Sequence, residues 1–253
     1  GGCFGSKFGW ERPNWFAPDG VEPRDKPSYG RANWFEHVAR EHRHTREAVS
    51  LFDESSFAKY RLEGPDAEKA LSWICANDIA VEPGRLVYTQ LCNRRGGIEA
   101  DLTVCRLAED QFYIVTGTGS AARDFNWIGR NIPDGSDVRF TDVSMASAVL
   151  GLMGPLAREV LSQATDSDLS SGAFPFATSR ELQIAGATVR AMRVTFVGEL
   201  GWELHVPAGS AGAVYDRLME LGQAHGIANA GYRAIDSLRL EKGYRIWGAD
   251  VTP

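Results

Sequence analysis

The sequence predicts an α+β fold made of two related subdomains, each an antiparallel sheet with packed helices. Runs of apolar and β-branched residues are separated by short turns, which antiparallel strands allow and parallel strands do not. Amphipathic stretches with helical spacing stand between these runs. The segments GPDAEKAL at residues 64–71 and GPLAREVL at 154–161 match at Gly, Pro, Ala and Leu, which indicates an internal duplication. Gly-Pro is also a general strand-to-helix junction, so these segments alone leave both interpretations open.

Composition narrows the class of protein. The chain has 253 residues, 43% of them hydrophobic, which is enough for one large or two ordinary domains. A net charge of −6 argues against a nucleic-acid surface, and no apolar run approaches the roughly 18–20 residues that span a bilayer. No P-loop, G-x-G-x-x-G motif or nucleophile elbow is present. We expect no nucleic-acid or membrane partner.

Cysteine and histidine usage bears on redox compartment and metals. The chain has four cysteines and no C-x-x-C spacing, so disulfides are allowed, but reduced thiols are favoured in a chain with an adequate core. This predicts a cytoplasmic location, or the mitochondrial matrix in a eukaryote. His37, His42 and His44 fall on a polar helix, where we expect them to be solvated. The five histidines form no ligand cluster, so no metal site is predicted.

The elements follow in order from local patterns. Residues 1–32 are rich in Gly, Pro, Trp and charge, and predict no regular element. Three aromatic residues within positions 10–16 favour a packed arm, or a linker from a preceding domain, over a floppy terminus. Asn33 is expected to cap a helix over 34–50, with Glu36 completing a capping box. Further helices are expected after Gly64-Pro65 and over 120–132, 156–164, 211–225 and 233–242, each with an apolar stripe or a Ser, Gly or Gly-Pro boundary signal. Strands are expected at 51–53, 56–62, 86–91, 98–107, 111–116, 138–142, 146–152, 181–184, 188–196 and 202–206.

These elements predict a division of the chain into three parts. Residues 1–44 form an N-terminal arm with an entry helix, residues 45–142 the first subdomain, and residues 143–253 the second, with segments able to interleave.

One carboxylate stands out in the hairpin predicted over residues 86–107. Asp101 lies in the second strand among apolar neighbours, and a buried charge is costly unless it is paired or used. The turn at 93–97 allows Tyr88 and Asp101 to approach each other across the hairpin, where a phenol beside a carboxylate could support a flat ring. The alternative is a core aspartate satisfied by backbone amides.

Two other groups are candidates. Glu199 lies in a connection with two glycines, which allow close backbone approach; the alternative is a solvated turn residue. Glu203 alternates with apolar residues and is expected on the solvent face of a strand. Arg233, Asp236 and Arg239 can share one side of a helix, either in a site or in a surface ladder of salt bridges.

Together these motifs resemble the folate-dependent aminomethyltransferase family, typified by the T-protein of the glycine cleavage system. The resemblance covers nearly the whole chain and rests on Y-T-x-x-x-N-x-x-G-G-I-x-x-D at 88–101, G-E-x-G-x-E at 198–203 and D-S-L-R-L-E-K-G-Y-R at 236–245. The opening G-W-E-R-P-N-W-F at 9–16 resembles the folate-binding half of dimethylglycine and sarcosine dehydrogenases.

The resemblance implies a central pocket for tetrahydrofolate and roles for particular residues. Asp101 matches the catalytic aspartate that activates the folate nitrogen, and Glu199 matches the glutamate that binds the pterin ring. Tyr88 matches an aromatic residue that lines the folate site. The family arginine that precedes Asp-Ser-Leu-Arg is Ile235 here, and Arg233 is the candidate to replace it in cofactor binding.

The resemblance also implies an enzyme that forms 5,10-methylenetetrahydrofolate from an oxidised N-methyl amine such as sarcosine or dimethylglycine. Its alternatives are a folate-dependent methyltransferase or demethylase with another donor, or a non-catalytic folate-binding module. Its expected partners are folate, a methylamine-derived substrate and a flavin-dependent oxidoreductase domain in cis or in trans. FAD is expected only on such a preceding domain, absent from this chain, and the family's C-terminal barrel domain is expected to be missing.

Overall fold

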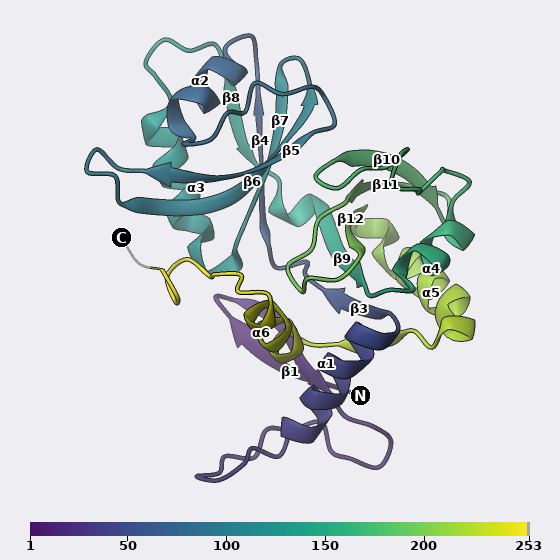
Figure 1. Ribbon diagram of the computed structural model, residues 1–253. Helices are drawn as coiled ribbons and strands as arrows, with labels where there is room; N and C mark the ends of the chain where they lie inside the picture. The colour runs from purple at the N-terminus through teal and green to yellow at the C-terminus, as the bar shows by residue number, and fades with distance from the viewer. Residues whose placement is uncertain (252–253) are drawn as a thin grey trace. The chain divides into compact units, whose positions relative to one another are not determined.

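The computed structural model describes residues 1–251, and the chain divides into two compact units built from discontinuous segments (Figure 1). The first unit contains residues 1–55, 147–176 and 181–244, and the second contains residues 56–146, 177–180 and those from 245 onward. Both are built on antiparallel sheets with helices, so the predicted α+β class is confirmed. The predicted division at 1–44, 45–142 and 143–253 stays a prediction; the compact units show that segments distant in sequence pack together.

A six-stranded sheet is the framework of the first unit. Its strands are β3 (Ser50–Asp53), β9 (Ser147–Met153), β10 (Ser179–Ile184), β11 (Ala187–Met192), β12 (Gly201–Pro207) and β13 (Ala228–Ala230), in the order β10-β11-β12-β9-β3-β13. The pair β3–β13 is parallel, and β11–β12, β12–β9 and β9–β3 are antiparallel. Two helices, α4 (Ala157–Ala164) and α5 (Ala211–Gly222), lie against this sheet (Figure 1). Their apolar residues form the main core together with sheet residues such as Leu152, Trp202 and Leu204. Short 3-10 turns flank α5 at η3 (Ala208–Ser210) and η4 (Gln223–His225).

The first sixteen residues form a β-hairpin, so the prediction of no regular element there is wrong. Strands β1 (Gly2–Lys7) and β2 (Trp10–Phe16) pair antiparallel through a two-residue turn. Phe8 and Gly9 adopt φ values of 52° and 86° in this turn, a geometry suited to hairpins. Pro13 is tolerated because both strands of a two-stranded sheet are edges. The predicted packing of the aromatic residues is confirmed for Trp15, which is fully buried in a second core.

Helices α1 (Phe35–Glu47) and α6 (Tyr232–Glu241) complete the first unit beside this hairpin. Trp34, not Asn33, precedes the first turn of α1, and it makes no side-chain cap. The amide group of Asn33 instead accepts the Lys26 N–H at 2.9 Å and donates to the Arg24 carbonyl at 2.9 Å. The predicted capping box is therefore wrong, because local loop contacts compete for the Asn33 side chain.

A five-stranded sheet forms the second unit. Its strands are β4 (Ala58–Glu63), β5 (Leu86–Cys92), β6 (Ile98–Ala108), β7 (Gln111–Thr116) and β8 (Arg139–Asp142), in the order β5-β6-β7-β4-β8, all antiparallel. Helices α2 (Ala67–Ile74) and α3 (Ala121–Asn131) pack with Tyr60, Leu62 and Phe112 in its core. Turns η1 (Thr118–Ser120) and η2 (Ser144–Ala146) precede α3 and β9.

The two sheets have matching topologies. Strands β4, β5, β6 and β7 of the second unit correspond in order to β9, β10, β11 and β12 of the first. Helices α2 and α3 correspond to α4 and α5, and turn η1 corresponds to η3, at the same places in the order. Beside β4 lies β8, and in the corresponding place beside β9 lies β3. Strand β3 is followed directly by β4, and β8 by η2 and β9, so each unit takes this strand from the segment that leads into the other unit.

The Gly-Pro junctions have the same backbone geometry, which supports the duplication over a generic junction. Gly64 and Gly154 have φ values of 136° and 135°. A Cβ at Gly64 would collide with the Asp137 carbonyl oxygen, and one at Gly154 with the carbonyl oxygen of Ala48. Asp137 and Ala48 each lie two residues before the start of a strand, β8 and β3 respectively. The equivalence of the two junctions therefore extends to β8 and β3, which we call the exchanged strands because each comes from the segment that leads into the other unit.

The four cysteines are free thiols, as predicted. Cys3, Cys75 and Cys105 are buried, and Cys92 is half-buried. Burial raises the pKa of Cys75 to about 12, which keeps this thiol protonated.

Candidate functional site

Tyr88 and Asp101 meet on one face of the hairpin formed by β5 and β6. Gln90 is the direct partner of Asp101 and Thr103 that of Tyr88, so the two residues are diagonal neighbours. The Tyr88 hydroxyl donates to Asp101 Oδ2 at 2.7 Å. The approach across the hairpin that the sequence predicted is present.

Asp101 is half-buried and does not lie in the core. Its apolar neighbours Ala100 and Leu102 are buried on the opposite face of the strand, because successive side chains alternate. Asp101 is thus the partly buried carboxylate beside a phenol that the sequence predicts, and not a core aspartate held by backbone amides. Within the described residues, the Asp101 carboxylate accepts its hydrogen bond from Tyr88.

Tyr88 keeps a proton to donate. Its side chain is 56% exposed, yet partial burial, followed by the hydrogen bond to Asp101 and its charge, raises the pKa of Tyr88 to about 12. The phenol therefore stays neutral and orients one carboxylate oxygen, while the other oxygen of Asp101 remains available as an acceptor.

Glu199 projects from a loop whose two glycines have structural reasons. Gly198 has a φ of 81°, and a Cβ there would collide with the Lys242 side chain. Gly201 lies against Met153 of β9, where a Cβ would also collide. The predicted close approach of this backbone to a neighbour is therefore confirmed. The neighbours are the side chain of Lys242 and residue Met153.

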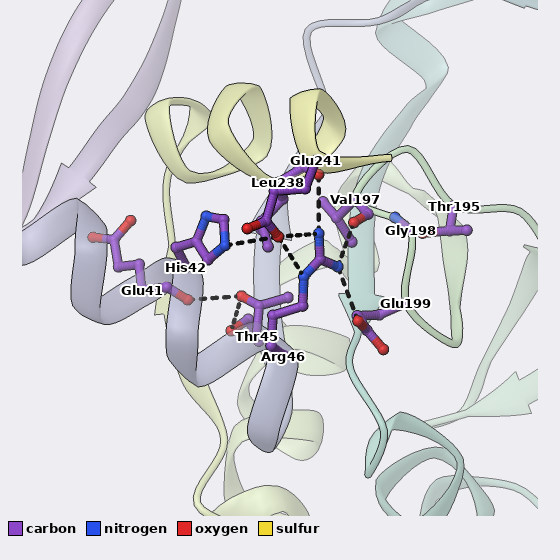
Figure 2. A network of polar contacts seen from close by, with 11 residues as sticks. Glu41, His42, Thr45, Arg46, Thr195, Val197, Gly198, Glu199, Leu238 and Glu241 are labelled. Atoms are coloured by element: carbon purple, nitrogen blue, oxygen red, sulfur yellow. Dashed lines mark hydrogen bonds and ion pairs between the residues drawn. The ribbon is translucent and has the colours of Figure 1, made fainter. Parts of the chain in front are cut away.

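Arg46, at the end of α1, holds Glu199, and sequence reasoning missed it. Arg46 Nη1 donates to Glu199 Oε1 at 2.9 Å and to the Val197 carbonyl at 2.7 Å (Figure 2). Arg46 Nη2 donates to the Leu238 carbonyl at 2.9 Å, and Nε donates to Glu241 Oε2 at 3.1 Å. The side chains of Arg46 and Glu199 are only 18% and 22% exposed, so this ion pair is shielded from solvent.

His42 extends the same network. Its ring contacts Ser237 Oγ at 2.9 Å and Glu241 Oε2 at 3.1 Å, so the expectation of a solvated histidine is wrong at this position. The hydrogen bond from Arg46, together with His42, lowers the pKa of Glu241.

Glu203 is not on a solvent face, contrary to prediction. Its side chain is 13% exposed and lies 3.8 Å from His205 Nε2. Glu54, which is almost fully buried, lies against Gly151, and its Oε2 finds no hydrogen-bond partner among the described residues. Burial, with added repulsion from Glu203 and Asp53, raises the pKa of Glu54 well above its ordinary value.

Arg233 is engaged by the N-terminal arm. Its guanidinium donates to both Asp25 oxygens, at 2.8 and 2.6 Å, and stacks over Trp34 with a centroid distance of 4.2 Å. The same Asp25 accepts the indole N–H of Trp15 at 2.8 Å, and the Arg233 hydrogen bond lowers its pKa. Arg233 therefore has a structural partner, and its role in cofactor binding stays a prediction.

Of the predicted ladder on α6, only the pair of Asp236 and Arg239 forms among the described residues, and Arg239 is buried and not on the surface. Arg239 Nε donates to Asp236 Oδ1 at 2.8 Å. Of the four predicted site residues, the structure thus brings Tyr88 and Asp101 together in the second unit. Glu199 and Arg233 belong to the first unit, where they have separate partners.

The described residues offer neither a metal-binding cluster nor a membrane-spanning helix. Among residues 1–251, no cluster of three or more His, Cys, Asp or Glu side chains could hold a metal ion. No described helix has the length and apolar character to cross a membrane.

Comparison with known proteins assigns the chain to a family. The chain is 44% identical over 253 residues to 4-methylaminobutanoate oxidase (formaldehyde-forming) of Paenarthrobacter nicotinovorans. This alignment covers 100% of this chain and 31% of that protein. The chain is 39% identical over 291 residues to human mitochondrial sarcosine dehydrogenase, again over 100% of this chain and 32% of the relative. The chain thus spans about a third of the length of these curated relatives.

A solved structure agrees. The glycine cleavage system aminomethyltransferase T from Bartonella henselae superposes with a TM-score of 0.81 at 31% identity, covering 100% of this chain and 62% of that one. The model of the GCVT N-terminal domain matches residues 1–253. The chain therefore belongs to the GCVT family, the folate-dependent aminomethyltransferases.

Proposed function

We propose that this chain transfers a one-carbon unit to tetrahydrofolate, forming 5,10-methylenetetrahydrofolate from an oxidised N-methyl amine such as sarcosine or dimethylglycine. The observation that carries the proposal is the Tyr88–Asp101 pair, a half-exposed carboxylate whose hydrogen bond comes from a neutral phenol and not from the main chain. The second oxygen of this carboxylate accepts no hydrogen bond within residues 1–251, so it can accept one from a bound molecule.

The residues present fit a reduced pterin. The amide edge of a pterin presents N–H donors, which carboxylate oxygens accept strongly. Glu199 uses Oε1 for Arg46, and its Oε2 makes no hydrogen bond within residues 1–251. Tyr88 adds an exposed aromatic ring against which a flat ring can stack. We therefore assign cofactor binding to Tyr88 and Glu199, with Arg233 as a further candidate.

Tetrahydrofolate, when bound, supplies the amine that accepts the one-carbon unit. Asp101 is the group we assign to take the proton that this amine gives up, and its negative charge also stabilises positive charge that develops at the transferred carbon. Tyr88 fixes the orientation of the carboxylate through its 2.7 Å hydrogen bond. Such general-base assistance contributes about 10²–10⁴-fold to rate.

The donor class rests on the relatives. Sarcosine dehydrogenase and 4-methylaminobutanoate oxidase are named for N-methyl amines that carry a carboxylate, which supports this chemical class for the donor. We propose a flavin-dependent oxidoreductase domain, in cis or in trans, as the source of the oxidised amine. The mitochondrial location in the name of the human relative supports a matrix location in a eukaryotic source.

The test separates binding from transfer. The chain would be titrated calorimetrically with tetrahydrofolate, and methylenetetrahydrofolate formation would be measured with sarcosine and a flavin-dependent amine dehydrogenase added in trans. Asp101→Asn should bind tetrahydrofolate within about threefold of wild type, while the rate of product formation falls about 10²–10⁴-fold.

The matched control is Asp142→Asn, an exposed aspartate at the end of β8 in the same unit. It should leave both measurements unchanged. Undiminished product from Asp101→Asn would remove Asp101 from the reaction. Tight tetrahydrofolate binding with no product from any N-methyl amine would favour a non-catalytic folate-binding module, and product from 4-methylaminobutanoate in preference to sarcosine would favour another donor.

A further inference from the structure

The Arg46 network points to a residue that shapes the folate site through Glu199. We propose that Arg46 is a positioning residue, which fixes the orientation of the Glu199 carboxylate so that its second oxygen is presented to the ligand. The inference rests on the proposed function and deepens it, since it concerns how the proposed pterin-binding glutamate is held.

Every nitrogen of the Arg46 guanidinium is engaged. A guanidinium has five N–H groups in a fixed plane. Nη1 donates to Val197 and Glu199, Nη2 donates to Leu238 and forms an ion pair with Glu241 at 3.1 Å, and Nε donates to Glu241. Such a set fixes the guanidinium in position as well as direction, so it offers Glu199 a rigid partner.

The loop that carries Glu199 is fixed by the same nitrogen. Arg46 Nη1 binds both the Val197 carbonyl and the Glu199 carboxylate, two residues apart. Between them, the Gly198 N–H donates to Thr195 Oγ1 at 3.0 Å. The backbone and the side chain of Glu199 are therefore held together, which reduces the rotamer freedom that ligand binding would otherwise have to remove.

The two carboxylate oxygens of Glu199 have different surroundings. Oε1 faces the guanidinium, and Figure 2 shows the second oxygen directed away from it. The guanidinium occupies Oε1 and leaves Oε2 as an acceptor for an N–H group. A lysine at position 46 would keep the charge but not the planar set of donors, so it would hold Glu199 less well.

A double-mutant cycle tests the inference. Tetrahydrofolate affinity would be measured by calorimetry for wild type, Arg46→Lys, Glu199→Gln and the double variant, with thermal unfolding recorded for each. Each single variant should weaken binding about tenfold, and Arg46→Lys should add little in the Glu199→Gln background. The loss of thermal stability from Arg46→Lys should be smaller in the Glu199→Gln background, because the two residues are in direct contact.

Arg106→Lys is the matched control. Arg106 also donates to three backbone carbonyls and pairs with a carboxylate, Glu68, at 2.7 Å, but these contacts lie within the second unit and do not include Glu199. It should lower the melting temperature as Arg46→Lys does, and change the affinity by less than about twofold.

The outcomes separate the two proposals. Absence of tetrahydrofolate binding by the wild type would overturn the proposed function and this inference together. The role of Arg46 alone would be overturned if Glu199→Gln weakens tetrahydrofolate binding but Arg46→Lys does not change the affinity. It would also be overturned if Arg46→Lys weakens binding equally in the wild-type and Glu199→Gln backgrounds. If Arg46→Lys does not fold, Glu199→Asp withdraws the carboxylate from Arg46 while keeping its charge; wild-type affinity for that variant would also overturn the inference.

Discussion

Glu54 carries a buried carboxyl group that titrates differently in the folded and unfolded chain. Because its folded-state pKa is raised, the folded chain keeps a proton that the unfolded chain loses above about pH 4.5. Its contribution to the free energy of unfolding is therefore favourable at low pH and is lost as pH rises. Each unit of such a shift corresponds to about 1.4 kcal/mol.

Glu54→Gln removes this titration while keeping the shape of the side chain. Near pH 4.5, the melting temperature of the variant should equal that of wild type or lie below it. From pH 5 to pH 8, the melting temperature of the variant minus that of wild type should rise steadily. Thermal unfolding followed by circular dichroism across this range measures the difference. Glu220→Gln, an exposed glutamate on α5, is the control and should show no such trend; a flat difference for Glu54→Gln would mean that its carboxyl ionises normally.

The sequence could predict the Tyr88–Asp101 pair but not the Arg46–Glu199 pair. The first lies across a single hairpin, where the turn and the alternation of side chains limit which residues can meet. The second joins residues 153 positions apart on a helix and a loop, and no local pattern marks an arginine at a helix end as special. The prediction that Glu203 faces solvent is wrong for a related reason. Alternation along a strand shows that Glu203 lies on the face opposite its apolar neighbours, but it does not show whether other elements cover that face.

At the scale of elements, the Gly-Pro junctions make a sharp prediction. Gly154→Ala places a Cβ against the Ala48 carbonyl in a backbone conformation that alanine rarely adopts. We expect a loss of about 3 kcal/mol or more in the free energy of unfolding, measured by urea denaturation. Gly64→Ala should cost a similar amount, because its φ and its carbonyl neighbour are equivalent.

Gly172→Ala is the control for both variants. A Cβ at Gly172 meets nothing within 4 Å, and the residue does not have a positive φ. It should change the free energy of unfolding by less than about 0.5 kcal/mol. If Gly154→Ala is as stable as wild type, the junction adjusts easily to a Cβ atom. The shared φ of Gly64 and Gly154 would then not be required by the fold.

Most elements were predictable because their signals are local. Strand β7 has the predicted bounds, and α6 ends at Glu241, one residue before the predicted end, with Gly243 at a φ of 70° shortly after it. The N-terminal hairpin was not predicted, since its turn is Phe8-Gly9 and not a typical hairpin pair, and Pro13 lies within a strand. The capping role given to Asn33 failed because a longer-range loop contact took the side chain.

At the scale of the whole molecule, the exchanged strands make the two units unequal. Every strand of the sheet in the second unit lies within residues 58–142, a continuous stretch. The sheet of the first unit needs β3 between β9 and β13, and β3 lies in the N-terminal segment together with α1 and the hairpin. Topology therefore makes one unit nearly continuous and leaves the other dependent on a distant segment.

This difference predicts how fragments should behave. A fragment of residues 56–146 keeps all five strands and both helices of its sheet, so it should fold alone, with a cooperative melting transition and dispersed amide resonances. A fragment of residues 147–253 lacks β3, which leaves β9 with an unpaired edge and removes part of the core around Trp15. It should stay unfolded or aggregate, and adding residues 1–55 as a separate chain should restore a cooperative transition. Independent folding of 147–253 would show that the exchanged strand is dispensable, and failure of 56–146 to fold would show that the second unit needs the remainder of the chain.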